Sequence, residues 1–377
     1  MLITSDANTQ LEDTLAKMAE AAELDLTRWN RLKTAYEAIS KWLSEDPDFF
    51  SEVEIEIYPQ GSVSIGTTTK PYGKTEFDLD VVIHIKLLSS NYDPEIIFDE
   101  VVRRLNEHET YKKISEPKSR CVRLNYQGDF HLDVVPGCMV VVYNHELIDI
   151  PDQKNKVWLR SCPKGYQKWF IDIANRVQVT LLEKAFSAHK VEIEEYAKKK
   201  PLQRAVQLIK MRRNIYFNEK PENAPTSIIL TTLAAQFYDG QASISEAFES
   251  IVSSIRNHIQ TLYPHRPFEL PNPVNPGENL ADVWEAEPEL YQHFISFIEH
   301  IYKEWEELKE SHGIEEEAEL MKGMFGEDPY IRAMEAKADS VNQKRENGGL
   351  GILSTGVMVD RAVEKSLPVK PNTFYGD

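Results

Sequence analysis

The sequence predicts an α+β protein with a mixed sheet in its first half and helices in its second half. Short segments that alternate apolar and polar residues, typical of half-buried strands, lie before about residue 160. Apolar residues spaced three and four apart dominate from about residue 165 onward. A run of strands with one early helix, followed by helices, indicates a mixed sheet with helices packed on a face.

The first half opens with a predicted helix over residues 7–45, which Asp46-Pro47-Asp48 ends. The next predicted elements are strands at 53–58 and 77–85, a helix at 94–109, a hairpin of strands at 121–126 and 130–135 around Gln127–Asp129, and a short strand at 140–143.

The second half contains predicted helices at 165–174, 178–198, 201–217, 226–239, 243–261 and 287–311. We expect three parts: a sheet lobe with the N-terminal helix over residues 1–160, a helical lobe over 161–340, and a partly mobile tail over 341–377.

Composition excludes several classes of function. Among the 377 residues, 43 Lys and Arg stand against 61 Asp and Glu, a net charge of −18. A long basic groove for nucleic acid is therefore not expected, but small nucleotides with a bound metal fit this charge. No run of 18 apolar residues predicts a membrane span. The polar N-terminus and three unpaired cysteines predict a reducing, cytoplasmic location.

Asp78 and Asp80 place two carboxylates on one face of the strongest predicted strand. Alternate residues of a strand point to the same face, so Phe77, Leu79 and Val81 face the other way. Two like charges there are costly to bury unless a cation lies between them. A divalent metal such as Mg²⁺ meets that need, and a solvent-exposed sheet face is the simpler alternative.

Asp133 is a third carboxylate, within the apolar strand Phe130–Val135. If this strand pairs with the first, the three carboxylates converge. Such a group can hold two metals about 4 Å apart for in-line phosphoryl transfer. A surface charge near a turn is the alternative for Asp133 taken alone.

Phosphate-binding residues are predicted in both halves. Gln60-Gly61-Ser62 follows a strand, where glycine permits a close backbone approach and Ser62 can hold a phosphate. Lys210 lies beside the apolar stripe of its helix, so its positive charge needs a counter-charge. Ser227 begins the next helix, where backbone N–H groups point outward and can bind a phosphate. A plain turn, a lysine reaching solvent and a capping serine are the simpler alternatives.

The pattern of Gly61-Ser62, Asp78-x-Asp80 and Asp133 on a later strand resembles the polymerase-β-like nucleotidyltransferases. Over about residues 50–290 the sequence is similar to the bacterial cGAS/DncV-like nucleotidyltransferases (CD-NTases) of CBASS anti-phage systems, and most similar to their clade D. The segments that carry the resemblance are Tyr58–Ser62, Phe77–Asp80, His131–Pro136, Cys162–Phe170, Ala224–Ala234 and Pro271–Trp284.

The resemblance implies a two-lobed fold, with a mixed sheet lobe packed on an α-helical lobe around a cleft. It implies Mg²⁺ (or Mn²⁺) as cofactor and the joining of ATP, with GTP as a further candidate, into a cyclic oligonucleotide, here a cyclic trinucleotide. The implied catalytic and metal-binding residues are Asp78, Asp80 and Asp133. The implied nucleotide-binding residues are Gln60, Gly61, Ser62, Lys210 and Ser227, with Asn279 and Asp282 near a base.

The resemblance also implies partners. The cyclic nucleotide would activate a downstream effector, and an E1/E2-like conjugation enzyme would act on the C-terminus at Pro371–Asp377. Because the chain is acidic and has no zinc insertion of cysteine and histidine, no DNA activator is expected. No membrane partner is expected either, because no apolar run is long enough to span one.

Two other functions remain open. One is a nucleotidyltransferase that modifies RNA or protein, although the acidic balance argues against a tRNA substrate. The other is an inactive scaffold with the same fold, against which the presence of all three carboxylates argues.

Overall fold

The computed structural model describes residues 3–73, 77–126, 130–141, 144–177, 199–311, 313–352, 358–360 and 367–368. The chain divides into two compact units. The larger unit spans residues 22–311, and the smaller unit joins residues 1–21 to residues 312–377. The boundaries at residues 160 and 340, which would separate a sheet lobe, a helical lobe and a tail, stay predictions.

In the smaller unit, the first helix packs against the last one. α1 (Ile3–Ala21) contacts α15 (Glu327–Glu346), where Lys337 Nζ lies 3.0 Å from Thr14 Oγ1 and 3.4 Å from an Asp13 carboxylate oxygen. The other elements are α14 (Ile314–Phe325) and the small strands β10 (Leu350–Ile352), β11 (Met358–Asp360) and β12 (Leu367–Pro368). Much of the predicted tail, including Pro371–Asp377, lies outside the described residues.

The larger unit begins with a mixed sheet and its covering helices. Its strands are β1 (Ile55–Pro59), β2 (Phe77–Leu88), β3 (Ser115–Pro117), β4 (Val122–Tyr126), β5 (Phe130–Val141), β6 (Asn144–Asp152) and β7 (Val157–Ser161). Its first helices are α2 (Leu26–Ser44), α3 (Gly61–Ser64), α4 (Pro94–Asn106) and α5 (Glu109–Ile114), with a 3₁₀ turn at Ser89–Asn91.

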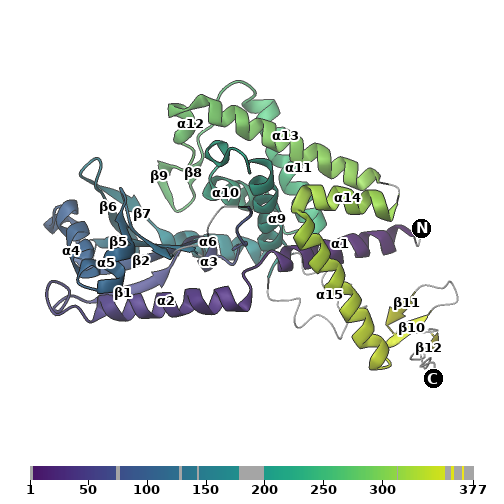
Figure 1. Cartoon of the computed structure of the whole chain (residues 1–377). Coiled ribbons are helices and arrows are strands. Elements are labelled where there is room, and N and C mark those ends of the chain that lie inside the picture. The colour runs from purple at the N-terminus through teal and green to yellow at the C-terminus, as the bar shows by residue number, and fades with distance from the viewer. Residues whose placement is uncertain are drawn as a thin grey trace. The chain divides into compact units, whose positions relative to one another are not determined.

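Helices dominate the rest of the larger unit. They are α6 (Pro163–Ala174), α9 (Pro201–Tyr216), α10 (Ser227–Phe237), α11 (Ile244–Leu262), α12 (Val283–Ala286) and α13 (Pro288–Glu310), with a 3₁₀ turn at Pro221–Asn223 and the hairpin strands β8 (Pro271–Asn272) and β9 (Asn275–Asn279). In Figure 1 the sheet with α4 and α5 lies on one side of this unit and α9, α10, α11 and α13 on the other, with α3 and α6 between them. Among the described residues, no helix is long and apolar enough to cross a membrane.

The register of the sheet separates an apolar face from a polar one. β2 pairs with β1 in antiparallel and with β5 in parallel orientation, and β4 pairs with β5 in antiparallel orientation. Leu79, Val81 and Ile83 of β2 are at most 1% exposed and belong to the core that α2 and α4 cover. Asp78 and Asp80 therefore point to the opposite face, as the alternation predicted.

The structure confirms the predicted hairpin of β4 and β5 and the helices that became α4, α6, α9, α10, α11 and α13. Two predictions are wrong. The helix expected over 7–45 is two helices, because Asp25 caps α2 by accepting a hydrogen bond from the Arg28 N–H at 2.9 Å. The strand expected at 140–143 is not separate, because β5 continues to Val141. The predicted helix at 178–198 and the turn at 127–129 lie outside the described residues.

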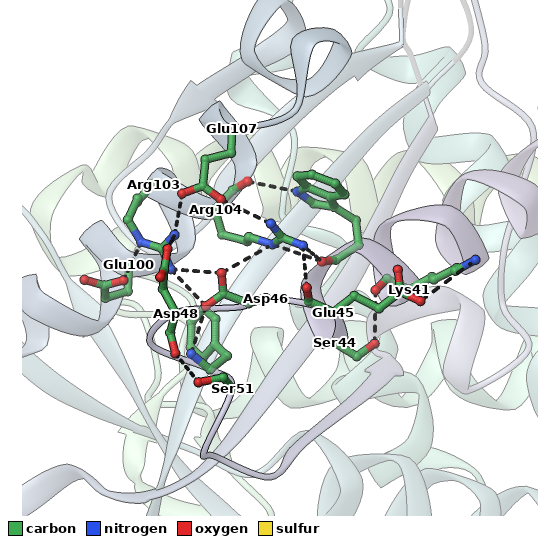
Figure 2. A network of polar contacts seen from close by, with 12 residues as sticks. Lys41, Ser44, Glu45, Asp46, Asp48, Ser51, Glu100, Arg103, Arg104 and Glu107 are labelled. Carbon is green, nitrogen blue, oxygen red and sulfur yellow. Dashed lines mark hydrogen bonds and ion pairs between the residues drawn. The ribbon is translucent and has the colours of Figure 1, made fainter.

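A buried polar network ties the end of α2 to α4 (Figure 2). Asp46, whose side chain is 0% exposed, accepts hydrogen bonds from Arg103 Nη2 at 2.9 and 3.1 Å and from the Phe50 N–H at 2.8 Å. Arg104 packs its guanidinium 3.7 Å from the centre of the Trp42 ring and donates to the carbonyl oxygens of Trp42 and Glu45. The network holds α2 and α4 together at the edge of the core.

We expect Asp46→Asn to lower the free energy of unfolding by about 2 kcal/mol, because it removes the buried carboxylate that accepts from Arg103 and from the Phe50 N–H. Urea denaturation followed by circular dichroism measures the loss. The control is Asp48→Asn, since Asp48 pairs with Arg103 at 3.4 Å but its side chain is 67% exposed, so its loss should stay below about 1 kcal/mol. Equal losses for the two variants would contradict the assignment.

Candidate active site

A cavity of about 560 Å³ opens between the sheet and the helices of the larger unit. Ligand-binding clefts commonly have volumes of about 300–1,000 Å³, so a nucleotide fits in it. Of the predicted site residues, the ones that line it are Gln60, Gly61, Ser62, Asp78, Asp80, Lys210 and Ser227. The structure thus brings residues from both halves of the sequence to one cavity.

Two of the three predicted carboxylates, Asp78 and Asp80, line the sheet side of this cavity, and Asp133 lies on the neighbouring strand. Asp80 of β2 is directly opposite Asp133 of β5 in the parallel ladder. Asp78 is the most accessible of the three, with its side chain 55% exposed, and the Asp133 side chain is 11% exposed. Burial, together with the charges of Asp133 and Asp78, raises the pKa of Asp80 to about 6. The site therefore holds more negative charge than its surroundings easily accommodate.

Arg123, which the sequence analysis did not single out, contacts two of these carboxylates. It lies on β4 directly opposite Asp133, and its Nε and Nη2 atoms donate to Asp133 Oδ1 and Oδ2, both at 2.8 Å. Its Nη2 atom also lies 3.5 Å from Asp78 Oδ1. The hydrogen bonds to Asp133 raise the pKa of Arg123 above its ordinary value. Alternation along β4 places Arg123 on one face, but only the pairing with β5 reveals its partner.

The donor set suits a divalent cation such as Mg²⁺, which prefers carboxylate oxygens. A cation would also relieve the repulsion that raises the pKa of Asp80. In the part of the chain that the structure describes, however, no three acidic, histidine or cysteine side chains lie close enough together to hold a metal ion as they stand. The backbone brings the three aspartates onto neighbouring strands, while the side chain of Asp133 is engaged with Arg123.

Gly61 allows the turn after β1 to approach the carboxylates. Its φ is +63°, a conformation that favours glycine, and a Cβ atom there would lie 2.7 Å from Asp80 Oδ2. The neighbouring Gln60 N–H donates to the Asp80 carbonyl oxygen at 2.9 Å. Ser62 follows within α3. The structure thus shows a close backbone approach at Gly61 to the Asp80 carboxylate, and the phosphate contact expected at Gly61 and Ser62 stays a prediction.

Lys210 is a buried cation on the helical side of the cavity. It is 6% exposed, and its Nζ atom donates to the Thr67 carbonyl oxygen at 3.0 Å. Burial, helped by the charge of Arg213, lowers the pKa of Lys210 to about 7. A lysine in this state becomes fully charged when an anion binds beside it.

Ser227 begins α10, as predicted, and contacts a second cation that the sequence analysis missed. Arg213 Nη1 donates to Ser227 Oγ at 2.9 Å and to the Pro225 carbonyl oxygen at 3.2 Å. Burial lowers the pKa of Arg213 to about 10. Arg213 lies three residues after Lys210 on α9, and helical spacing could have identified it as a residue of the same face.

The structure does not place Asn279 and Asp282 on the cavity wall. Asn279 Oδ1 instead accepts hydrogen bonds from the backbone N–H groups of Leu270 at 2.9 Å and Ala281 at 3.1 Å. Asp282 is exposed and precedes α12. From the same segment, Glu278 and Leu280 line the cavity. The segment therefore reaches the cavity through side chains other than the two that the sequence predicted, and its contact with a base stays a prediction.

Comparison with known proteins identifies relatives of the whole chain. Residues 10–174 match the Second Messenger Oligonucleotide or Dinucleotide Synthetase (SMODS) domain. A protein of Roseivirga ehrenbergii named c-di-GMP synthase is 83% identical over 377 residues, which is 100% of both chains. The cyclic dinucleotide synthase CdnG of Bradyrhizobium diazoefficiens is 25% identical over 86% of this chain and 83% of that protein.

Solved structures share the fold. Bradyrhizobium diazoefficiens CdnG in complex with GTP has a TM-score of 0.69 and 21% identity, over 87% of this chain and 99% of that one. Escherichia coli DncV in its 3'-deoxy GTP bound form has a TM-score of 0.57 and 16% identity, over 88% and 90% of the two chains. These similarities confirm the α+β polymerase-β-like nucleotidyltransferase fold, with a mixed sheet and many helices.

The finer assignment to clade D stays a prediction. Identity of 83% over the full length of a synthase, together with the SMODS match, confirms the resemblance that Asp78, Asp80 and Asp133 first indicated. The chain belongs to the cGAS/DncV-like nucleotidyltransferases (CD-NTases) and is a nucleotidyltransferase enzyme.

Proposed function

We propose that this enzyme joins two molecules of GTP into cyclic di-GMP, with divalent metal ions bound by Asp78, Asp80 and Asp133. The observation that carries the proposal is the parallel pairing of β2 with β5, which puts Asp80 opposite Asp133 beside a nucleotide-sized cavity. The relative named c-di-GMP synthase, 83% identical over its full length, supports the identity of the product.

The expected cyclic trinucleotide built from ATP has no such support. Both curated relatives are named for cyclic dinucleotides, one of them for c-di-GMP. We therefore replace the expected ring of three nucleotides by a ring of two and the expected ATP by GTP.

Two equivalent transfers close the proposed ring. In each, a ribose hydroxyl gives up its proton to solvent and forms a bond to the α-phosphorus of a 5′-triphosphate, which belongs to a GTP in the first transfer and to the linear dinucleotide in the second. The bond between that α-phosphorus and the bridging oxygen of the β-phosphate breaks, and pyrophosphate leaves with that electron pair. Mg²⁺ or Mn²⁺ would lower the pKa of the attacking hydroxyl and neutralise the triphosphate. Lys210 and Arg213 supply positive charge from the helical side of the cavity, and Ser62 and Ser227 supply hydroxyl groups for phosphate oxygens.

Glu278 is our candidate for the residue that selects guanine. Its Oε2 atom accepts hydrogen bonds from Asn272 Nδ2 at 2.8 Å and Asn275 Nδ2 at 3.2 Å, which fix the carboxylate on β9 at the cavity wall. The Watson–Crick edge of guanine presents two donors, N1–H and the 2-amino group, and a carboxylate accepts from both. Adenine presents an acceptor beside its amino group and cannot pair with a carboxylate in this way.

The signalling role belongs to the same proposal. A cyclic dinucleotide made on phage infection would reach a downstream effector by diffusion, in the manner of the CBASS systems that the sequence resembles. The cytoplasmic location and the conjugation enzyme acting on Pro371–Asp377 stay predictions. No observation in the described residues favours transfer to RNA or protein, or an inactive scaffold.

We expect Asp80→Asn to lower the rate of cyclic di-GMP formation by about a thousandfold or more, because the two-metal arrangement loses a ligand. The assay incubates GTP and Mg²⁺ with the protein, treats the mixture with phosphatase and identifies the product by mass spectrometry. Asp99→Asn, an exposed aspartate on α4, is the matched control and should retain full activity. If Asp80→Asn keeps more than a tenth of the activity, or wild type yields no guanine ring, the proposal is wrong.

We expect Lys210→Met to weaken the binding of a non-hydrolysable GTP analogue by about 10- to 100-fold, because a charge-assisted contact is lost. Since the folded pKa of Lys210 is about 7 against an ordinary 10.5, its charged form costs stability below pH 7, and this cost disappears as the pH rises towards 10.5. Unlike most core substitutions, Lys210→Met should therefore not lower the melting temperature at pH 6.

The same pKa predicts proton uptake. At pH 8 the free enzyme holds Lys210 mostly neutral, and the triphosphate favours the charged form, so binding should take up close to one proton. Calorimetry of analogue binding in buffers of different ionisation enthalpy measures this uptake. If the proton uptake is unchanged in Lys210→Met, another group takes up the proton and this prediction is wrong.

We expect Glu278→Gln to reduce kcat/KM for GTP by about 10- to 100-fold, because the amide can accept only one of the two guanine donors and leaves the other without an acceptor. The binding of an ATP analogue should change less than about threefold, which separates base selection from general damage. Glu285→Gln, an exposed neighbour on α12, is the control for charge removal. Equal losses with the two nucleotides would argue for a purely structural role of Glu278 in its hairpin.

A further inference from the structure

Arg123, Asp133 and Asp80 form a row across three adjacent strands. Arg123 of β4 lies directly opposite Asp133 of β5, which lies directly opposite Asp80 of β2. Directly opposed side chains on one face of a sheet lie close enough to interact. The guanidinium is therefore set by the sheet register itself, rather than by a loop, at the carboxylate that the proposed function assigns to a metal.

The contact between Arg123 and Asp133 occupies both oxygens of the carboxylate. The two hydrogen bonds, each 2.8 Å long, form the parallel fork that arginine makes with carboxylates. Because each bond fixes one oxygen, the plane and the direction of the Asp133 carboxylate are defined. Both side chains are largely shielded from water, with Arg123 28% and Asp133 11% exposed.

The Arg123 guanidinium also lies where its positive charge would repel a metal ion bound by the aspartates. Arg123 Nη2 reaches to 3.5 Å from Asp78 Oδ1 while bonding Asp133 Oδ2, so one positive group stands between two of the three carboxylates. The described side chains, with Arg123 in this position, do not gather into a metal-binding group. A divalent ion bound to Asp133 would meet the positive charge of Arg123 at short range.

From this arrangement we propose that Arg123 is the positioning residue of Asp133 and competes with the metal for it. In the free enzyme Arg123 holds the Asp133 carboxylate and partly neutralises the three aspartates. Metal binding draws Asp133 and Asp78 away from the guanidinium, so Arg123 keeps the metal affinity of the free enzyme low. The inference rests on the metal-binding role of Asp133 in the proposed function.

The test measures Mn²⁺ binding to the full-length protein without nucleotide, from the electron paramagnetic resonance signal of free Mn²⁺. Arg123→Gln, which removes the charge and the fork, should bind Mn²⁺ at least about tenfold more tightly than wild type, because a repelling charge is gone. Arg123→Lys, which keeps the charge, should stay within about threefold of wild type. An unchanged or weaker Mn²⁺ affinity in Arg123→Gln would overturn the competition.

A control variant separates the local effect from the change in net charge. Arg120 also carries a positive charge and pairs with an aspartate, Asp152, at 3.4 Å, but its side chain is 58% exposed and its partner is none of the three site aspartates. Arg120→Gln should leave the Mn²⁺ affinity at the wild-type value. A gain equal to that of Arg123→Gln would show a general charge effect and would also overturn the inference.

Thermal unfolding provides a second readout that does not depend on activity. Without metal, Arg123→Gln should melt at a lower temperature than wild type, because Asp133 loses its partner, and Mn²⁺ should raise its melting temperature by more than that of wild type. A smaller metal-induced rise than in wild type would contradict the inference, and Arg123→Met, which also removes the charge, replaces this variant if Arg123→Gln does not fold.

Asp133→Asn distinguishes the two proposals. If it lowers Mn²⁺ affinity while Arg123→Gln does not raise it, the metal site stands and only the role of Arg123 is wrong. If Asp133→Asn leaves Mn²⁺ affinity unchanged, the metal-binding role of Asp133 fails and the inference fails with it.

Discussion

The parallel pairing of β2 with β5 is the constraint on which the rest of the site depends. Leu79, Val81 and Ile83 bury one face of β2 against α2 and α4, and this burial determines the face on which Asp78 and Asp80 lie. A slip of one residue would turn both carboxylates into the core, so the hydrophobic pattern enforces the register. The same register sets Asp133 opposite Asp80. The position of the acidic group is thus a consequence of core packing.

The two sides of the cavity carry opposite charges that are both poorly solvated. Burial raises the pKa of Asp80 to about 6 on the sheet side and lowers the pKa of Lys210 to about 7 on the helical side. In each case burial disfavours the charged form of the group. A ligand that brings cations to the carboxylates and phosphates to the lysine would reverse both pKa shifts. Shifts of this kind are concentrated at functional sites because the ligand supplies the missing charges. A metal–triphosphate complex, the ligand of the proposed function, would supply both missing charges.

Local patterns predicted much of the fold and of the site. The alternation of apolar and polar residues predicted β2, β4 and β5 and placed Asp78 and Asp80 on one face. The spacing of apolar residues three and four apart predicted α9, which carries Lys210. The break between α1 and α2 was missed because apolar spacing continues across it, although α1 belongs with α15 of the smaller unit, more than 300 residues away in sequence. Periodicity within a window carries no information on such distant partners.

The sequence by itself determined the chemical class of the enzyme, because the segments that hold the three aspartates, Gly61 and Lys210 resemble those of the nucleotidyltransferases, while their patterns alone define only strand, turn and helix. Only the tertiary structure decided which groups meet them. Arg123 acquires its role from the pairing of β4 with β5, and Arg213 from the return of the chain to Ser227. In the irregular segment that holds Glu278, no repeating pattern indicates that this side chain, and not Asn279 or Asp282, faces the cavity. Partners separated along the chain are selected by the register and packing of whole elements, which no single segment encodes.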